Sequence, residues 1–212
     1  MKAMSRRRWL RVFVLSLLLF PFLTAAQCIS KAKDITIDIP PFDQSLEFDV
    51  DIDALVAKKG VKADADGKLP AQSPEVTIPF DVAEEVDFSD DANVKKYGSK
   101  ISYVKVELIT VTPVTNSVNV DLPTLQIQMS ERGKDNYQTV GTLDSIKAGA
   151  TNTQNLVSDA AGKAHLEAML LKFGFNLKAK AAFVLKPGMP IPKGKLKLKV
   201  RLKFQLGVSP FK

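Results

Sequence analysis

The sequence is poor in the side chains that most often carry chemistry. Its 212 residues include one cysteine, one histidine and one tryptophan. A single cysteine cannot form an internal disulfide, so the fold must depend on its apolar core. The single histidine, His165, lies in an expected helix, and no serine has a recognisable nucleophile elbow around it. The sequence therefore gives no support for a Ser-His-Asp or Cys-His site.

Motifs for metals and cofactors are missing as well. No Cys/His cluster has zinc spacing, no Gly-x-Gly-x-x-Gly follows a strand, and no phosphate loop ends in Gly-Lys-Ser/Thr. Residues 62–67 superficially resemble a calcium loop, but Lys62 and Ser73 stand where acids are needed, which favours a flexible Asp-Gly turn. Carboxylate catalysis needs two suitably spaced acids, and nothing singles out a pair. We expect a protein with no catalytic residues, no metal and no cofactor.

Long apolar runs are also scarce, with one exception near the start of the chain. Five basic residues and no acid precede an apolar run over residues 12–20, which Pro21 and the small residues 24–26 follow. This layout is typical of a secretory signal peptide. A spanning helix needs about 20 uninterrupted apolar residues, so an uncleaved anchor is the less favoured alternative. We predict an export signal over residues 1–26 and one domain over residues 29–212.

The basic part of this leader bears on the export route. Residues 5–11 (SRRRWLR) resemble the twin-arginine export motif, with Trp9 and Arg11 in places where that motif prefers phenylalanine and lysine. The alternative is an ordinary basic segment that stays on the cytoplasmic side. Both export routes remain open.

Cys28 follows the leader directly. In a bacterial lipoprotein the signal is cut just before a cysteine that then carries the lipid, and Ala25 and Ala26 fit the recognition box whereas Gln27 is large for its place. The alternative is cleavage after Ala26, which would leave Cys28 as a free thiol. Lipidation of Cys28 would hold the protein on a membrane without a spanning helix.

The net charge of +7 is unevenly distributed. The first 28 residues contribute five positive charges, residues 29–92 hold 6 basic and 16 acidic groups, and residues 93–212 hold 19 basic and 7 acidic groups. The part beyond the leader is therefore nearly balanced, with an acidic front and a basic back.

Apolar and polar residues alternate with a period of two over much of the chain. This pattern predicts short strands at residues 35–39, 46–52, 76–82, 101–111, 117–120, 125–129 and 140–146, with loops at 58–74 and 84–91. One helix is expected over residues 160–173, capped by Asp159 and stopped by Gly174. Two long strands at 175–186 and 195–208 would then form an antiparallel C-terminal hairpin. We predict an all-β fold, an antiparallel β-sandwich of about 8–10 strands with one short helix before that hairpin.

Two charged patterns share this period of two. A basic stripe near the end of the chain consists of Lys195, Lys197, Lys199, Arg201 and Lys203, and an acidic ladder nearer the start consists of Glu47, Asp49, Asp51 and Asp53. The stripe suits anionic lipid headgroups or acidic polysaccharide, although its lysines could equally protect an exposed strand from aggregation. Nucleic acid is disfavoured because no aromatic residues interleave with the stripe. If the two patterns lie in one sheet they would pair; if they lie apart, they would favour head-to-tail self-association or a basic protein partner.

These features favour a bacterial cell-envelope protein, in the periplasm or at the outer membrane or cell surface. We expect a non-enzymatic binding or structural module. Two alternatives remain open at this point. One is a lipid or acyl-chain carrier, which needs an apolar cavity between the sheets, and the other is a small outer-membrane β-barrel.

Overall fold

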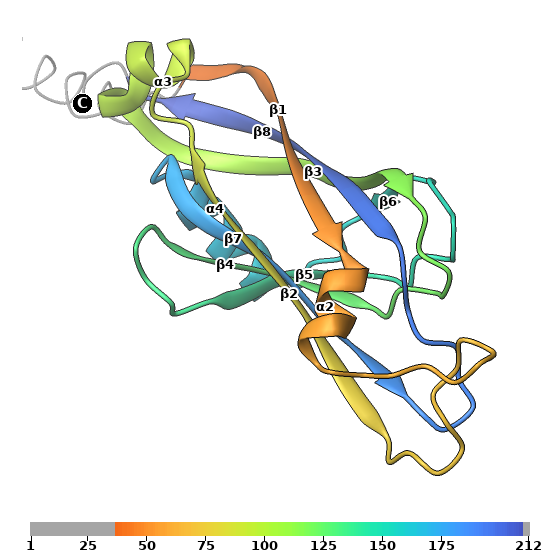
Figure 1. Cartoon of the computed structure of the whole chain (residues 1–212). Helices are drawn as coiled ribbons and strands as arrows, with labels where there is room; N and C mark the ends of the chain where they lie inside the picture. The colour runs from red at the N-terminus through yellow and green to blue at the C-terminus, as the bar shows by residue number, and fades with distance from the viewer. Residues whose placement is uncertain (1–36, 210–212) are drawn as a thin grey trace, which may run out of the picture.

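Two antiparallel four-stranded sheets pack face to face in the computed structural model, which describes residues 37–209 (Figure 1). The predicted all-β sandwich is confirmed. The predicted export signal over residues 1–26 and Cys28 lie outside the described residues.

The first sheet has the strand order β1-β8-β3-β6. Its members are β1 (Ile37–Asp51), β8 (Lys195–Val208), β3 (Ile101–Asn116) and the short β6 (Gln154–Asn155). In β8 the even-numbered residues from Leu196 to Leu206 are buried and the odd-numbered ones carry the charges, because successive side chains point to opposite faces of a sheet.

The second sheet has the order β2-β7-β4-β5. Its members are β2 (Val76–Asp87), β7 (Gly174–Leu185), β4 (Leu125–Glu131) and β5 (Gln138–Leu143). Strands β1 and β2 are the edges on one side of the sandwich. On the other side residues 154–157 join the sheets, because β6 pairs with β3 and Val157 exchanges two backbone hydrogen bonds with Thr142 of β5.

Apolar side chains from both inner faces form one continuous core. Phe88 connects the two sheets: its ring centroid lies 5.8 Å from that of Phe175 on β7 and 6.5 Å from that of Phe204 on β8. A void between the sheets, lined by residues such as Ile127, Phe175 and Leu202, measures about 10 Å³. That is about the size needed for one water molecule, so an acyl chain does not fit there unless the sheets separate.

Three α-helices occur among the described residues, where the sequence predicted one. They are α2 (Ile52–Lys58), α3 (Ala92–Tyr97) and α4 (Ala160–Leu170), and a 3₁₀ turn, η1 (Gly98–Lys100), follows α3. Asp159 caps α4 as predicted, since its Oδ1 accepts a hydrogen bond of 2.7 Å from the Gly162 N–H. The helix ends three residues earlier than expected, and Phe173 turns the chain at a φ of 57°.

The expected C-terminal hairpin is wrong. Strands β7 and β8 lie in different sheets, and residues 186–194 cross from one sheet to the other. β7 instead pairs with β2 and β4, while β8 pairs with β1 and β3.

Other boundaries also differ from expectation. The two strands expected before residue 53 are the single strand β1, whose register shifts between Ile39 and Phe42. β2 continues to Asp87 through half of the expected acidic loop, and residues 117–120 form no strand.

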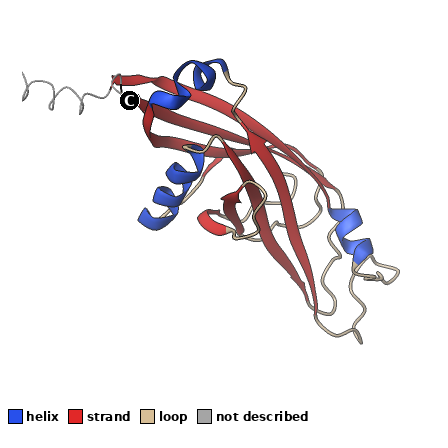
Figure 2. Ribbon diagram, turned by 90° about the vertical axis from the view of Figure 1, so that its left-hand side faces the viewer, coloured by secondary structure: helices blue, strands red, loops and turns tan. Residues whose placement is uncertain are grey.

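The two ends of the sandwich differ. At one end Ile37 pairs with Val208, so β1 begins where β8 ends, and we call this end the terminal pole. At the other end the chain segments 59–75, 117–123 and 186–194 are hydrogen-bonded to one another or to β8, and we call this end the loop pole (Figure 2). β8 has 14 residues, so the poles are about 46 Å apart at about 3.3 Å per residue. No helix of the described part of the chain is both long and apolar enough to span a membrane.

Candidate functional site

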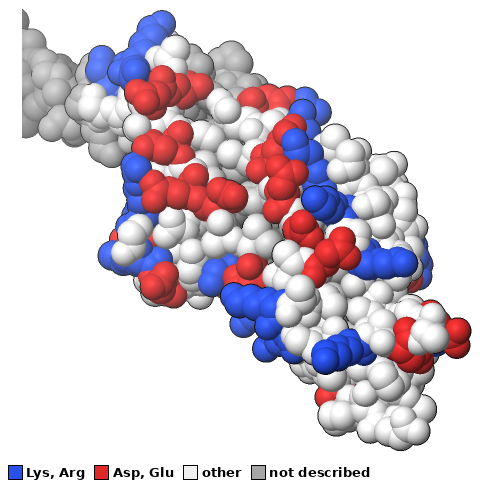
Figure 3. All heavy atoms as spheres, viewed as in Figure 1, with Lys and Arg blue, Asp and Glu red and all other residues white. Residues whose placement is uncertain are grey.

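The acidic ladder and the basic stripe lie side by side on the outer face of the first sheet. In the register of β1 and β8, Glu47 stands opposite Lys199, Asp49 opposite Lys197 and Asp51 opposite Lys195. The face drawn in Figure 3 accordingly shows acidic and basic side chains in adjacent rows rather than in separate patches.

Four of the five basic side chains in the stripe form ion pairs. Lys197 Nζ lies 3.1 Å from Glu47 Oε2 and 4.0 Å from Asp49 Oδ1, and Lys195 Nζ lies 3.4 Å from Asp51 Oδ2. The other two pairs are Lys203 with Glu107 and Arg201 with Asp43, the latter bidentate.

These contacts shift several pKa values in the direction expected of paired charges. The hydrogen bond from Arg201 lowers the pKa of Asp43, and the hydrogen bond to Glu47 raises the pKa of Lys197. The pKa of Asp51 is lowered first by the Ala54 N–H, which it caps, and then by Lys195. These pKa shifts favour the charged forms of Asp43, Asp51 and Lys197.

The structure thus places the acidic ladder beside the basic stripe. The sequence alone allowed the two either to pair in one sheet or to lie apart. Binding of an anionic surface by the stripe stays a prediction, and such a ligand would have to compete with carboxylates that the lysines already contact. Protection of an exposed edge does not explain the stripe, because β8 lies between β1 and β3. Asp53 lies apart from the ladder in the first turn of α2, where its Oδ1 accepts a hydrogen bond of 3.2 Å from the Gly194 N–H.

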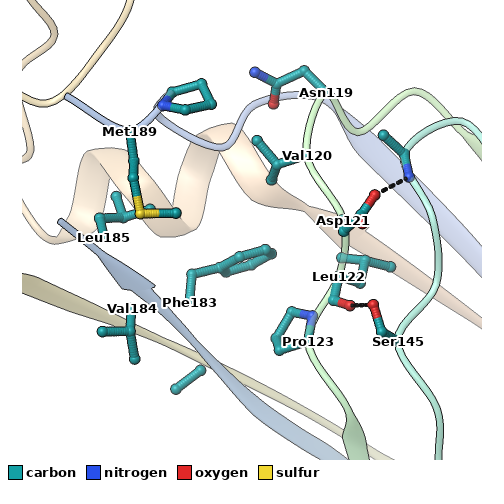
Figure 4. Close-up of a pocket in the computed structure, with 13 residues that line it drawn as sticks. Asn119, Val120, Asp121, Leu122, Pro123, Ser145, Phe183, Val184, Leu185 and Met189 are labelled. Carbon is teal, nitrogen blue, oxygen red and sulfur yellow. Dashed lines mark hydrogen bonds between the residues drawn. The ribbon is translucent and has the colours of Figure 1, made fainter.

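A second feature is a hollow of about 540 Å³ at the loop pole, which we call the β7 hollow. This volume is within the range of small-ligand sites. Its walls come from three segments far apart in the sequence, residues 119–123, residues 145–148 and residues 182–190 (Figure 4). Phe183 is buried at its floor, whereas Val184 and Met189 are 46% and 41% exposed.

The polar side chains that line the β7 hollow are used to hold its walls. Asn119 bonds to the carbonyl of Ile191 and to the N–H of Lys193, and Ser145 donates to the Leu122 carbonyl. Asp121 accepts from Lys147 Nζ at 2.6 Å and from the Ala148 N–H at 3.0 Å, and the hydrogen bond from Lys147 lowers its pKa. All three polar side chains are thus engaged with other parts of the protein.

In the described part of the chain, the backbone at the floor of the β7 hollow has strand partners on one edge only. The ladder between β7 and β4 ends at the pair Lys180 and Gln126, whereas the ladder between β7 and β2 continues to Leu185 and Val76. Residues 181–185 therefore have one open edge, and that edge faces residues 119–123.

The remaining site predictions are simple to place. His165 lies on α4 with its Nε2 3.3 Å from the Met129 carbonyl oxygen, which is a structural contact. Within residues 37–209, no group of three or more His, Cys, Asp or Glu side chains could hold a metal ion.

The sequence did not predict the β7 hollow. Its apolar residues resemble those of any half-buried strand, and the signal that marks its place is the cluster of Pro187, Gly188 and Pro190 after β7. That cluster predicted a loop correctly but gave no information about what the loop would face.

Comparisons with known proteins add little. No family model matches the chain, and no curated protein matches it. Among solved structures, it is similar to a protein of Desmodium yellow mottle tymovirus at 12% identity and a TM-score of 0.24, covering 80% of this chain and 89% of that one. It is also similar to a chain described as the decameric BFDV capsid protein, at 8% identity and a TM-score of 0.31, covering 81% and 99%. Such low scores carry no argument about function.

Proposed function

We propose that this chain is an exported protein of the bacterial cell envelope. In this proposal residues 1–26 are its export signal, and the β-sandwich is a non-enzymatic binding or structural module. The basic segment, the apolar run and the small residues before Cys28 support export. We further propose that a lipid on Cys28 tethers the module to a membrane.

The position of the terminal pole supports the tether. Strand β1 begins at Ile37, nine residues after Cys28, and these residues can span at most about 30 Å. A lipid on Cys28 would therefore keep the terminal pole close to the membrane. The loop pole, about 46 Å away along β8, would face outward.

The use of polar groups at the loop pole supports a binding rather than a catalytic role. Asn119, Asp121 and Ser145 all hydrogen-bond to other parts of the protein, and the other side chains that line the β7 hollow are apolar. This is the single structural observation on which the binding role rests: an open recess whose polar side chains are engaged and whose apolar lining includes the exposed Val184 and Met189.

Intact-mass analysis of the protein isolated from its native membrane tests the tether. We expect a chain that begins at Cys28 and carries two or three acyl chains. The variant Cys28→Ser should lose the added mass and leave the membrane fraction, whereas the control Ser30→Ala should behave like the wild type.

Two outcomes would contradict the proposal. An unmodified chain that begins at Gln27 would exclude the lipid tether while leaving export intact. A full-length chain that retains residues 1–26 in the cytoplasmic fraction would exclude export itself.

A further inference from the structure

We propose that the β7 hollow binds an extended, apolar peptide segment of another protein, and that this segment pairs with the open edge of β7. This inference goes beyond the proposed function, because it names a site and the chemistry of its partner. It holds or fails independently of where the protein is located.

Beyond Lys180, one edge of β7 has no partner strand among residues 37–209. In an antiparallel pair, alternate residues direct both their N–H and C=O groups toward the partner strand, and the residues between them direct these groups the other way. Pro79 of β2, which has no N–H, stands opposite Ala182 of β7. A proline is tolerated where its missing N–H would point away from the partner, so Pro79 and Ala182 form a non-hydrogen-bonded pair.

This assignment gives the direction of the backbone groups in the hollow. If Ala182 does not bond to β2, its N–H and C=O point to the opposite edge, and so do those of Val184, two residues further on. That edge is the open one, because the ladder with β4 ends at Lys180. Two residues of β7 therefore offer backbone donors and acceptors within a recess lined by apolar side chains.

The open backbone groups favour a peptide over an alkyl chain as the occupant. An alkyl chain in this place would cover the backbone groups of Ala182 and Val184 without bonding to them, which is unfavourable. An extended peptide satisfies them by strand addition, while its alternate side chains reach Phe183 on the inner side and Val184 on the outer side. Met189 is long and flexible, and it can adjust to the side chain that enters.

The unpaired charges beside the recess are basic. Lys186 directly follows β7, and Lys193 adjoins Asn119 through two hydrogen bonds of its backbone. Both lysines are exposed, and neither forms an ion pair with any residue of 37–209. The acid nearest to the recess, Asp121, is already paired with Lys147. A segment with acidic residues beside its apolar ones is therefore the best match.

The occupant that we propose comes from another molecule. Strand β1 begins and strand β8 ends at the terminal pole, about 46 Å along β8 from the loop pole where the hollow lies.

The test uses the purified protein and the synthetic peptide Ac-Asp-Val-Thr-Val-Thr-Asp-NH₂, with binding followed by amide NMR and hydrogen exchange. In the free protein, the amides of Ala182 and Val184 should exchange faster than those of Ala181 and Phe183, which bond to β2. The peptide should shift the signals of Ala182 and Val184 and slow their exchange.

Variants of the protein and altered peptides separate the contributions of side-chain contact, backbone pairing and charge to binding. Val184→Glu should weaken binding about tenfold or more, which corresponds to about 1.4 kcal/mol. Val114→Glu is the matched control, because Val114 has the same exposed fraction of 46% but lies on β3, and it should bind like the wild type. A peptide with N-methylated valines should lose binding, and a peptide with lysine at both ends should bind more weakly.

Several results would overturn the proposal. The absence of any change at Ala182 and Val184 at millimolar peptide would exclude the site. Equal binding of the N-methylated peptide would exclude strand addition, and fast exchange of Ala181 and Phe183 together with slow exchange of Ala182 would show that the assigned edge is wrong.

Discussion

Lys197 reaches diagonally across the first sheet, so that its Nζ lies 3.1 Å from Glu47 although its register partner is Asp49. The carboxylate of Asp49 is 4.0 Å away from the same Nζ. One cation is thus shared between two acids of the neighbouring strand, and the pairing of β1 with β8 is supported by charge as well as by backbone hydrogen bonds.

This shared pairing predicts a salt-dependent loss of stability when its charge is reversed. Glu47→Lys places a like charge beside Lys197 and Lys199 and should lower the melting temperature by a few degrees at low ionic strength. The loss should shrink in high salt, because exposed charges are screened. The double variant Glu47→Lys with Lys197→Glu should recover much of the loss, and a lack of recovery would show that the contact adds nothing.

Glu131 predicts a contribution to stability that depends on pH. Hydrogen bonds from Lys134 and Lys172 lower its pKa from 4.5 to about 2. Since the pKa is lower in the folded protein, the contribution is complete above about pH 4.5 and is lost as the pH falls toward 2. The melting temperature of Glu131→Gln should therefore lie below that of the wild type at pH 7, and the two should converge near pH 2. A constant difference across this range would contradict the assignment.

Position 141 has no space for a side chain, because β5 lies close to residues 156–158 where the two sheets are joined. A Cβ at this position would lie 2.6 Å from Leu156 Cγ and 2.7 Å from the Val157 carbonyl oxygen. Gly141→Ala should therefore push residues 156–158 away from β5 and cost about 1–3 kcal/mol of unfolding free energy. Gly98→Ala is the control, since its nearest neighbour would lie at 3.9 Å, and urea denaturation should show little change for it.

Shortening the side chain of Leu166 measures how much of the protein's stability comes from the packing of α4. Its side chain is buried against the sheets, whereas that of Leu171, just past the end of the helix, is 38% exposed. Leu166→Ala should lower the free energy of unfolding by about 2–5 kcal/mol. Leu171→Ala should have a much smaller effect, and equal losses for the two variants would mean that α4 is not docked as described.

The sequence predicted the local elements well where side-chain period dominates. The alternation over residues 195–208 gave the bounds of β8 as they are found, and Asp159 gave the start of α4. The prediction failed where the same local sequence is compatible with two different structures. The prolines after Ile39 indicated the end of a strand, yet the backbone continues through a shift in register, because β8 remains beside β1 on both sides of it.

The candidate sites were likewise predictable in part from the sequence and in part only from the structure. The members of the acidic ladder and the basic stripe were visible in the sequence, because their charges alternate with apolar residues. Their contact was not visible, since 144 residues separate Asp51 from Lys195, and only the register of β1 with β8 places them together. The β7 hollow could not be predicted from the sequence at all, because it depends on where the ladder between β7 and β4 stops.

By itself, then, the sequence determined that the chain forms strands with one apolar face and that these faces must be covered in a two-layered sandwich. The tertiary structure alone decided which strands are neighbours. The nine residues 186–194 could have turned β7 back into a hairpin, but they are also long enough to cross the roughly 10 Å between packed sheets. The crossing buries the apolar faces of β7 and β8 against each other instead of placing them side by side, and that choice depends on all the other strands.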